Sequence, residues 1–195
     1  MYVLSPIFLH SKFLLQKKKI KKEIVAIGRL TDQKNYIHLL KAWKIIENKL
    51  PDWKLNLYGE GEYKADLEKF IKDSQLKNIY LKGVSSDVSQ VYLKSDFFVM
   101  SSKYEGLPMV LIEAQSFGLP IVSYDCPFGP SDVIKDGYNG ILVENQNIDD
   151  LAQAMLTLAQ SLNLLSEYSV NSKENAKKYQ AKNILLMWEK MVLKG

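Results

Sequence analysis

The stretch EIVAIGRLTDQKNYIHLLKAWKIIENKL, residues 23–50, decides the fold. Its apolar start, residues 23–28, predicts a buried strand, and the apolar spacing that follows predicts a helix over 36–50. Asn35 stands where a helix N-cap is expected, and its side chain could cap the first turn. The predicted helix buries one face, which carries Leu39, Trp43, Ile46 and Leu50. A strand, a short loop and a helix in this order form the beginning of a βαβ unit.

The same alternation continues along the chain with short connections. Further strands are predicted at 53–58, 79–81, 97–100, 121–123 and 140–143. Helical segments are predicted at 62–74, 87–94, 108–117, 131–135, 148–162 and 184–192. This order predicts an α/β fold, a Rossmann-like open parallel sheet with helices on both faces. Such sheets bind ligands beyond the carboxyl ends of their strands. The loops to consider are therefore 28–34, 59–62, 83–87, 101–108 and 124–131.

Composition limits the class of protein. The chain has 195 residues, of which 47% are hydrophobic and 25% charged, with a net charge of +4. These values are typical of a folded globular domain. One cysteine, Cys126, indicates a reducing compartment, and we expect a cytoplasmic protein. His10, His38 and Cys126 do not have metal-ligand spacing, so no metal site is expected.

Part of the positive charge lies in one run, KKKIKK at residues 17–22. Short runs of this kind are usually solvated, and we interpret this one as a linker before the first strand. The alternative is contact with an anionic membrane surface or an acidic partner, which would place the chain at the inner face of a membrane. Acids in the predicted crevice argue against nucleic acid as a partner, because they would repel a phosphate backbone.

The first loop carries two cations before a helix. Gly28 allows a sharp turn at the end of the strand. Arg29 and Lys34 could together hold a diphosphate without a metal, although ordinary surface charge is the alternative. In the second loop, the sequence GEGE at residues 59–62 lacks a third glycine and is interpreted as a tight turn.

The fourth loop and its helix read SSKYEGLPMVLIEA, residues 101–114. Pro108 suits a first helical turn, whose free amides attract an anion. Glu113 lies in an otherwise apolar helix, so we expect it to be buried and to need partners such as the diol of a ribose. Glu105 could meet another part of the same ligand. The alternatives are a capping or solvent-facing Glu105, a salt bridge from Glu113 to a neighbouring helix, and a glycosidase acid pair.

A series of short motifs along the chain resembles the C-terminal domain of retaining GT-B glycosyltransferases, group 1 or family 4. The motifs are GRL at 28–30, KN at 34–35, YGEG at 58–61, LKG at 81–83, SS at 101–102, EGLP at 105–108, EA at 113–114, GLPIV at 118–122 and DGYNGILV at 136–143. Each motif is weak alone, and their shared order carries the resemblance. One departure is Asp132, which stands near a position where the family usually has glutamate.

The resemblance implies that the chain binds a nucleotide diphosphate sugar, a UDP- or GDP-sugar, and transfers the sugar with retention, without metal or other cofactor. Arg29 and Lys34 would hold the diphosphate and Glu113 the ribose. Glu105 would meet the sugar, so Glu105, Arg29 and Lys34 are the predicted catalytic residues. The remaining predicted binding residues are Gly28 at the turn, Gly83 and Val84 at the base, and the backbone of Gly106, Leu107, Pro108, Met109 and Val110 at sugar and phosphate.

The resemblance also implies a division of the chain and a set of partners. We expect a linker with the basic run at 1–22, a Rossmann-like nucleotide-sugar-binding domain at 23–163 and a C-terminal helical tail at 164–195. The expected acceptor is a glycan or lipid-linked molecule. We expect the N-terminal acceptor domain to be absent from this chain, which would leave it weakly active alone. The alternative is a non-catalytic interaction module, or a split subunit that needs a separate acceptor domain.

Overall fold

The computed structural model describes residues 20–180 and 182–183. Most of the predicted linker 1–22 and the whole predicted helix 184–192 lie outside these residues. Within them, no helix combines the length and the apolar character that crossing a membrane requires.

The centre of the fold is one parallel sheet of six strands in the order β3-β2-β1-β4-β5-β6. The strands are β1 (Glu23–Ile27), β2 (Lys54–Tyr58), β3 (Ile79–Leu81), β4 (Phe97–Met100), β5 (Ile121–Tyr124) and β6 (Gly140–Val143). The chain progresses outward in opposite directions from β1 and from β4, its neighbour. A parallel sheet forms a ligand-binding crevice at such a reversal, beyond the carboxyl ends of the strands. The predicted Rossmann-like sheet is confirmed.

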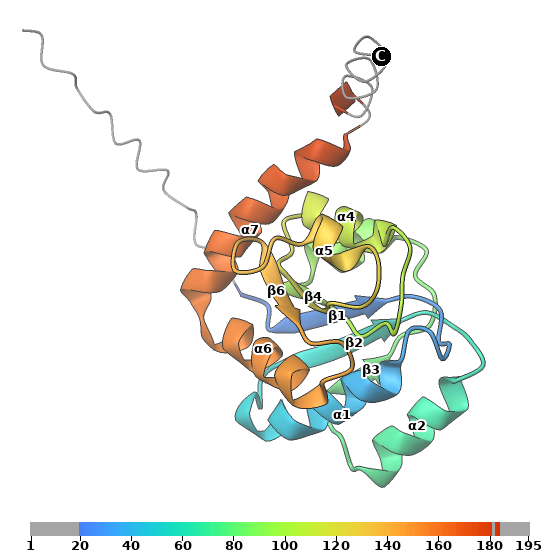
Figure 1. Cartoon of the computed structure of the whole chain (residues 1–195). Coiled ribbons are helices and arrows are strands. Elements are labelled where there is room, and N and C mark those ends of the chain that lie inside the picture. The colour runs from blue at the N-terminus through green and yellow to red at the C-terminus, as the bar shows by residue number, and fades with distance from the viewer. Residues whose placement is uncertain (1–19, 181, 184–195) are drawn as a thin grey trace, which may run out of the picture.

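Helices cover both faces of the sheet (Figure 1). They are α1 (Tyr36–Ile46), α2 (Lys64–Asp73), α3 (Val88–Leu93), α4 (Met109–Ser116), α5 (Pro130–Val133), α6 (Ile148–Gln160) and α7 (Leu162–Ala176), with 3-10 turns at Glu47–Lys49 and Lys177–Tyr179. Helices α1, α2 and α6 share one core cluster, and α3, α4 and α5 share the other. Helix α7 follows α6 and continues along α4.

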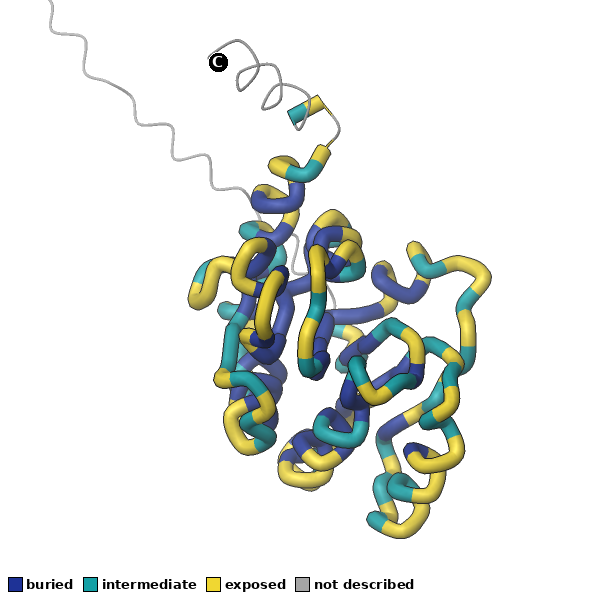
Figure 2. Tube along the Cα trace, turned by 45° about the vertical axis from the view of Figure 1, so that its right-hand side comes forward, coloured by how far each residue is buried: buried dark blue, intermediate teal, exposed yellow. Residues whose placement is uncertain are grey.

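The strands divide their side chains between these two clusters. In β1, Ile24 and Ala26 pack in the cluster of α1 and α6, whereas Val25 packs in the cluster of α3 and α4. All three are at most 1% exposed. Figure 2 shows the buried residues concentrated along the central strands. Burial of apolar side chains on both faces is what a covered parallel sheet requires.

Two local predictions were wrong or incomplete. Asn35 precedes α1, but its backbone is left-handed (φ 50°) and its side chain makes no capping hydrogen bond. Helix α7 lies almost wholly within the predicted helical tail at 164–195, but its own bounds were not predicted, because polar groups anchor much of it. Asn175 is 7% exposed, and its amide donates to Gln115 Oε1 at 2.9 Å and to the Val133 carbonyl at 2.8 Å. By contrast, the Asn147 side chain caps α6 by accepting from the Asp150 amide.

Candidate functional site

The loops after β1, β2 and β3 are joined by backbone hydrogen bonds at the carboxyl edge of the sheet. The Gly28 amide donates to the Tyr58 carbonyl at 3.0 Å, and the Gly59 amide donates to the Gly83 carbonyl at 2.8 Å. A Cβ atom on Gly59, whose φ is +146°, would lie 1.9 Å from the Gly28 carbonyl oxygen. Only glycine allows this close approach. The loops therefore form one continuous rim.

The loops after β1 and β4 meet at the reversal of strand order. Lys34 Nζ and Glu105 Oε1 form an ion pair at 2.5 Å. Ser101 Oγ donates to the Lys34 carbonyl at 2.9 Å, and the Lys103 amide donates to the Gln33 carbonyl at 2.8 Å. The structure thus brings together two residues that are 71 positions apart in the sequence and that were both predicted for the site.

The Lys34–Glu105 ion pair is shielded from water. The Lys34 side chain is 18% exposed and that of Glu105 only 8%. The alternative of a solvent-facing Glu105 is therefore wrong. An ion pair with so little exposure is weakly screened, and removing one partner would leave an unpaired charge in a poorly solvated place. The pair holds a cation and an acid side by side at the rim.

Two further polar side chains lie beside this pair and were not predicted. The first is Tyr36: a Cβ atom on Gly28 would lie 2.8 Å from Tyr36 Oη and 3.2 Å from Lys34 Cε, so the Tyr36 hydroxyl and the Lys34 side chain both border the turn at Gly28. The second is Cys126. Burial, and then the charge of Glu105, raise the pKa of Tyr36 above its usual value. The same two causes raise the pKa of Cys126 to about 11. Both groups are therefore protonated at neutral pH and are neither general bases nor thiolate nucleophiles.

The loop after β5 closes against the loop after β4. The Glu105 amide donates to the Pro127 carbonyl at 3.4 Å. A Cβ atom on Gly129 would lie 2.0 Å from the Gly106 carbonyl oxygen and 2.5 Å from Pro108 Cδ. This contact fixes the backbone of Gly106 and Pro108 immediately before α4. The loop after β5 thereby supports the predicted binding segment, a role that the sequence motifs did not indicate.

The start of α4 forms the exposed part of the rim. Pro108 precedes the helix and is buried, while Leu107 and Met109 are both 56% exposed and Val110 is half-buried. The first amides of a helix have no partner within the helix, and the helix dipole favours an anion beside them. The sequence places these amides next to Glu105 in the chain.

Glu113 was predicted to be buried, and that prediction is wrong. Helix α4 buries Leu111, Ile112, Ala114 and Gln115, and Glu113 is exposed. Its carboxylate accepts a hydrogen bond from Tyr92 Oη at 3.1 Å, so its partner on the neighbouring helix α3 is a hydroxyl group rather than a cation. Burial, and then the charge of Glu113, raise the pKa of Tyr92. Tyr92 therefore stays a hydrogen-bond donor and holds the Glu113 carboxylate in place.

The other predicted residues lie on the same edge but outside the ion pair. Arg29 is exposed, and among residues 20–180 and 182–183 no ion pair joins its guanidinium to an acid. Gly83 has a positive φ of +67°, and Val84 after it is 75% exposed. Arg29 and Val84 are therefore accessible to a ligand, but no contact joins them to Lys34 among the described residues.

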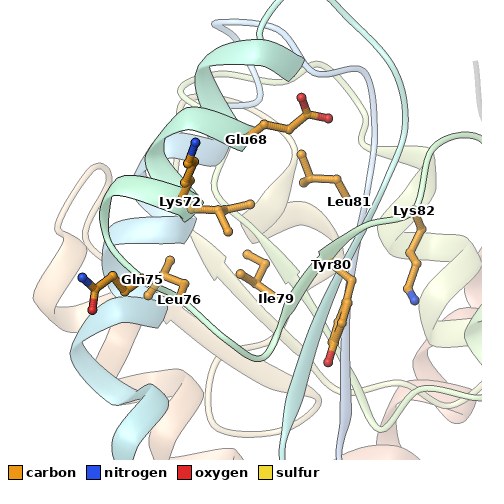
Figure 3. Close-up of a pocket in the computed structure, with 9 residues that line it drawn as sticks. Glu68, Lys72, Gln75, Leu76, Ile79, Tyr80, Leu81 and Lys82 are labelled. Atoms are coloured by element: carbon orange, nitrogen blue, oxygen red, sulfur yellow. The ribbon is translucent and has the colours of Figure 1, made fainter.

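Two open hollows lie beside β2 and β3, below the loops that follow these strands. One, of about 530 Å³, lies between α2 and the edge strand β3 (Figure 3). The other, of about 540 Å³, lies between α3 and the face of β1, β2 and β3. Among the described residues, no group of three or more histidine, cysteine, aspartate or glutamate side chains could hold a metal ion.

Comparisons with known proteins identify the family and the fold. The family model for group 1 glycosyl transferases matches residues 10–179. The amylovoran biosynthesis glycosyltransferase AmsD of Erwinia amylovora is 37% identical over 166 residues, which cover 85% of this chain and 46% of AmsD. A structure of Staphylococcus aureus TarM with UDP, fondaparinux and α-GlcNAc-glycerol aligns with a TM-score of 0.82 and 33% identity, covering 87% of this chain and 35% of that one.

A third relative shows which domain of the family this chain matches. The C-terminal domain of the group 1 glycosyl transferase LpcC from Francisella tularensis aligns with a TM-score of 0.76 and 26% identity, covering 86% of this chain and 91% of that one. This chain spans about half the length of AmsD and about a third of TarM. The chain belongs to the group 1 glycosyl transferases, and its fold is that of the C-terminal domain of a GT-B enzyme.

Proposed function

We propose that this chain binds a nucleotide diphosphate sugar, a UDP- or GDP-sugar, at the part of the rim where the loops after β1, β4 and β5 meet. The observation that carries the proposal is the shielded Lys34–Glu105 ion pair beside the exposed start of α4. A cation and free helix amides attract a diphosphate, while a carboxylate accepts from sugar hydroxyls. The UDP in the TarM structure supports this ligand class.

The proposed chemistry is retaining, metal-independent transfer of a hexosyl group. As the bond between the sugar and the diphosphate breaks, negative charge grows on the departing phosphate. Lys34, Arg29 and the amides of Met109 and Val110 would stabilise that charge, which is the role a metal fills elsewhere. Glu105 would orient the sugar. Glu105 holds the Lys34 ammonium at the rim, where it can meet a diphosphate.

Glu113 is proposed to bind the ribose. Its exposed carboxylate has about four lone-pair sites, and Tyr92 uses one of them. The remaining sites can accept both hydroxyls of a vicinal diol. Gly83 and Val84 would border the base, and the Tyr36 hydroxyl, next to Gly28, would add a neutral donor near the diphosphate.

Transfer to an acceptor is proposed for a protein that contains an acceptor half, because this chain spans about half of AmsD. The proposed acceptor is a glycan or a lipid-linked molecule. We expect this chain to bind the sugar nucleotide at the cytoplasmic side, either as part of such an enzyme or as a subunit that works with a separate acceptor domain.

The experiment is calorimetric titration of the chain with UDP, GDP, their hexose conjugates and 2′,3′-dideoxy-UDP. One diphosphate should bind with a dissociation constant of roughly 1 μM to 1 mM, and the dideoxy analogue more weakly. A chain that binds none of these ligands at millimolar concentration would refute the proposal. Equal affinity for UDP and its dideoxy analogue would remove only the ribose role of Glu113.

Gly106→Ala tests the proposed cradle without disturbing the unliganded chain. A Cβ atom on Gly106 has no atom within 4 Å, so the variant should unfold at the wild-type temperature. If the backbone here contacts the ligand, the added methyl group should weaken binding of the sugar nucleotide by about tenfold, as an overpacked contact does. Unchanged affinity, measured by the same titration, would place the ligand elsewhere.

A further inference from the structure

On the face opposite α1 and α2, the described residues leave a polar strip open along β2 and β3, although Val25 of β1 on the same face is buried under α3 and α4. In β2, Leu55 and Leu57 are buried in the cluster of α1 and α2, whereas Lys54, Asn56 and Tyr58 line the hollow on the opposite face. The side chains of Tyr80 in β3 and of Lys82, which follows β3, point away from those of Ile79 and Leu81 (Figure 3). Strands of a covered parallel sheet are usually apolar on both faces. The alternating sequence KLNLY of β2 therefore specifies an open face.

This hollow of about 540 Å³, which we call the lysine groove, is strongly basic. Four lysines border it: Lys21, Lys54, Lys82 and Lys94. Among the described residues that line it, Glu23 is the one acid, and two groups already engage it. Lys54 Nζ lies 3.5 Å from Glu23 Oε1, and the Asn56 amide donates to the other oxygen.

The other charged groups near the groove do not cancel its excess of positive charge. Asp96 lies beside it, and its carboxylate accepts from the backbone amides of Lys21 and Glu23 at 2.9 and 3.1 Å. The Lys82 ammonium lies over the Tyr80 ring, 4.6 Å from its centre. With four lysines against Glu23 and Asp96, the groove attracts anions.

We propose that the lysine groove binds a phosphate-bearing polyol or sugar chain, at a site distinct from the rim that holds Lys34 and Glu105. Lys54 lies in β2, and the other three lysines lie beside the ends of β1, β3 and α3, so the four can meet successive phosphates. The rings of Tyr58 and Tyr80 can pack against the carbon–hydrogen faces of polyol or sugar units. A concave surface suits a chain, whereas a flat bilayer would not enter it. The choice of a carbohydrate chain rests on membership of a sugar-transferring family.

The test measures fluorescence anisotropy of a labelled glycerol-phosphate oligomer with the wild-type chain at low and moderate salt. Two variants are compared: Lys54→Glu with Lys94→Glu in the groove, and Lys41→Glu with Lys49→Glu on the exposed surface of α1 and the turn after it. Both pairs change the net charge equally. We expect the groove variant to lose about tenfold or more in affinity and the surface variant little, with binding weakened by salt.

UDP titration of each variant shows whether the fold and the rim are intact. If the charge reversal prevents folding, the double variant Lys54→Gln with Lys94→Gln replaces it in the comparison. No oligomer binding by the wild-type chain, or equal losses in both variants, would overturn the proposal. An equally charged oligonucleotide that binds as tightly, or phosphatidylglycerol vesicles that bind through these lysines while the oligomer does not, would overturn the proposed ligand class. UDP binding in the same samples keeps these outcomes separate from failure of the sugar-nucleotide proposal.

Discussion

Lys34→Met should abolish UDP binding at concentrations that saturate the wild-type chain, and it should also destabilise the fold. The variant removes the shielded cation proposed for the diphosphate and leaves Glu105, which is 8% exposed, without its partner. Removing one partner of a buried ion pair typically costs about 3–5 kcal/mol. Titration with UDP and thermal or urea unfolding measure the two effects.

A second substitution separates binding from stability. Glu105→Gln combined with Lys34→Met removes both charges, so much of the lost stability should return while UDP binding stays absent. Lys103→Met is the matched control. Lys103 pairs with Asp32 at 2.6 Å across the same two loops, but its side chain is 31% exposed and that of Asp32 is 61% exposed. If Lys34→Met binds UDP with wild-type affinity, or Lys103→Met loses as much as Lys34→Met, the assignment of Lys34 to the diphosphate fails.

The sheet and the position of its crevice follow from the sequence for physical reasons. Runs such as 97–100 and 140–143 are apolar, short and bounded by turn residues, so both strands begin and end where predicted. The alternation of strands and helices gives a parallel sheet, and its reversal brings the loops after β1 and β4 to one edge. This is why Lys34 and Glu105, far apart in the sequence, could be assigned to one site.

The contacts that could not be predicted from the sequence depend on how helices and loops pack against one another. Residue types alone placed Glu113 in an apolar helix, but its exposure depends on which side of α4 packs against the rest of the fold. Tyr36 was counted as the start of a helix, yet its hydroxyl borders Gly28. Tyr92 became relevant only because α3 and α4 are adjacent. Contacts of this kind carry no periodic signal.

Gly129→Ala should distort the rim by moving one loop against another. The backbone at Gly129 has φ +90°, and a Cβ atom there would lie 2.0 Å from the Gly106 carbonyl oxygen and 2.5 Å from Pro108 Cδ. Because neither a carbonyl nor a proline ring can rotate away, the loop after β5 must withdraw. We expect a loss of about 2–4 kcal/mol in unfolding free energy, from positive φ and from overpacking together. Binding of the UDP-sugar should weaken more than binding of UDP.

Gly137→Ala isolates the steric part of this effect. Gly137 also has a positive φ, of +69°, but a Cβ atom there has no atom within 4 Å. The control variant should therefore lose only the conformational part, about 1–2 kcal/mol, and keep full affinity for UDP and UDP-sugar. Equal unfolding free energies and equal affinities in the two variants would mean that contact between the loops after β4 and β5 does not shape the site. A selective loss in Gly129→Ala would instead show that the sugar end of the rim depends on a glycine outside the predicted binding residues.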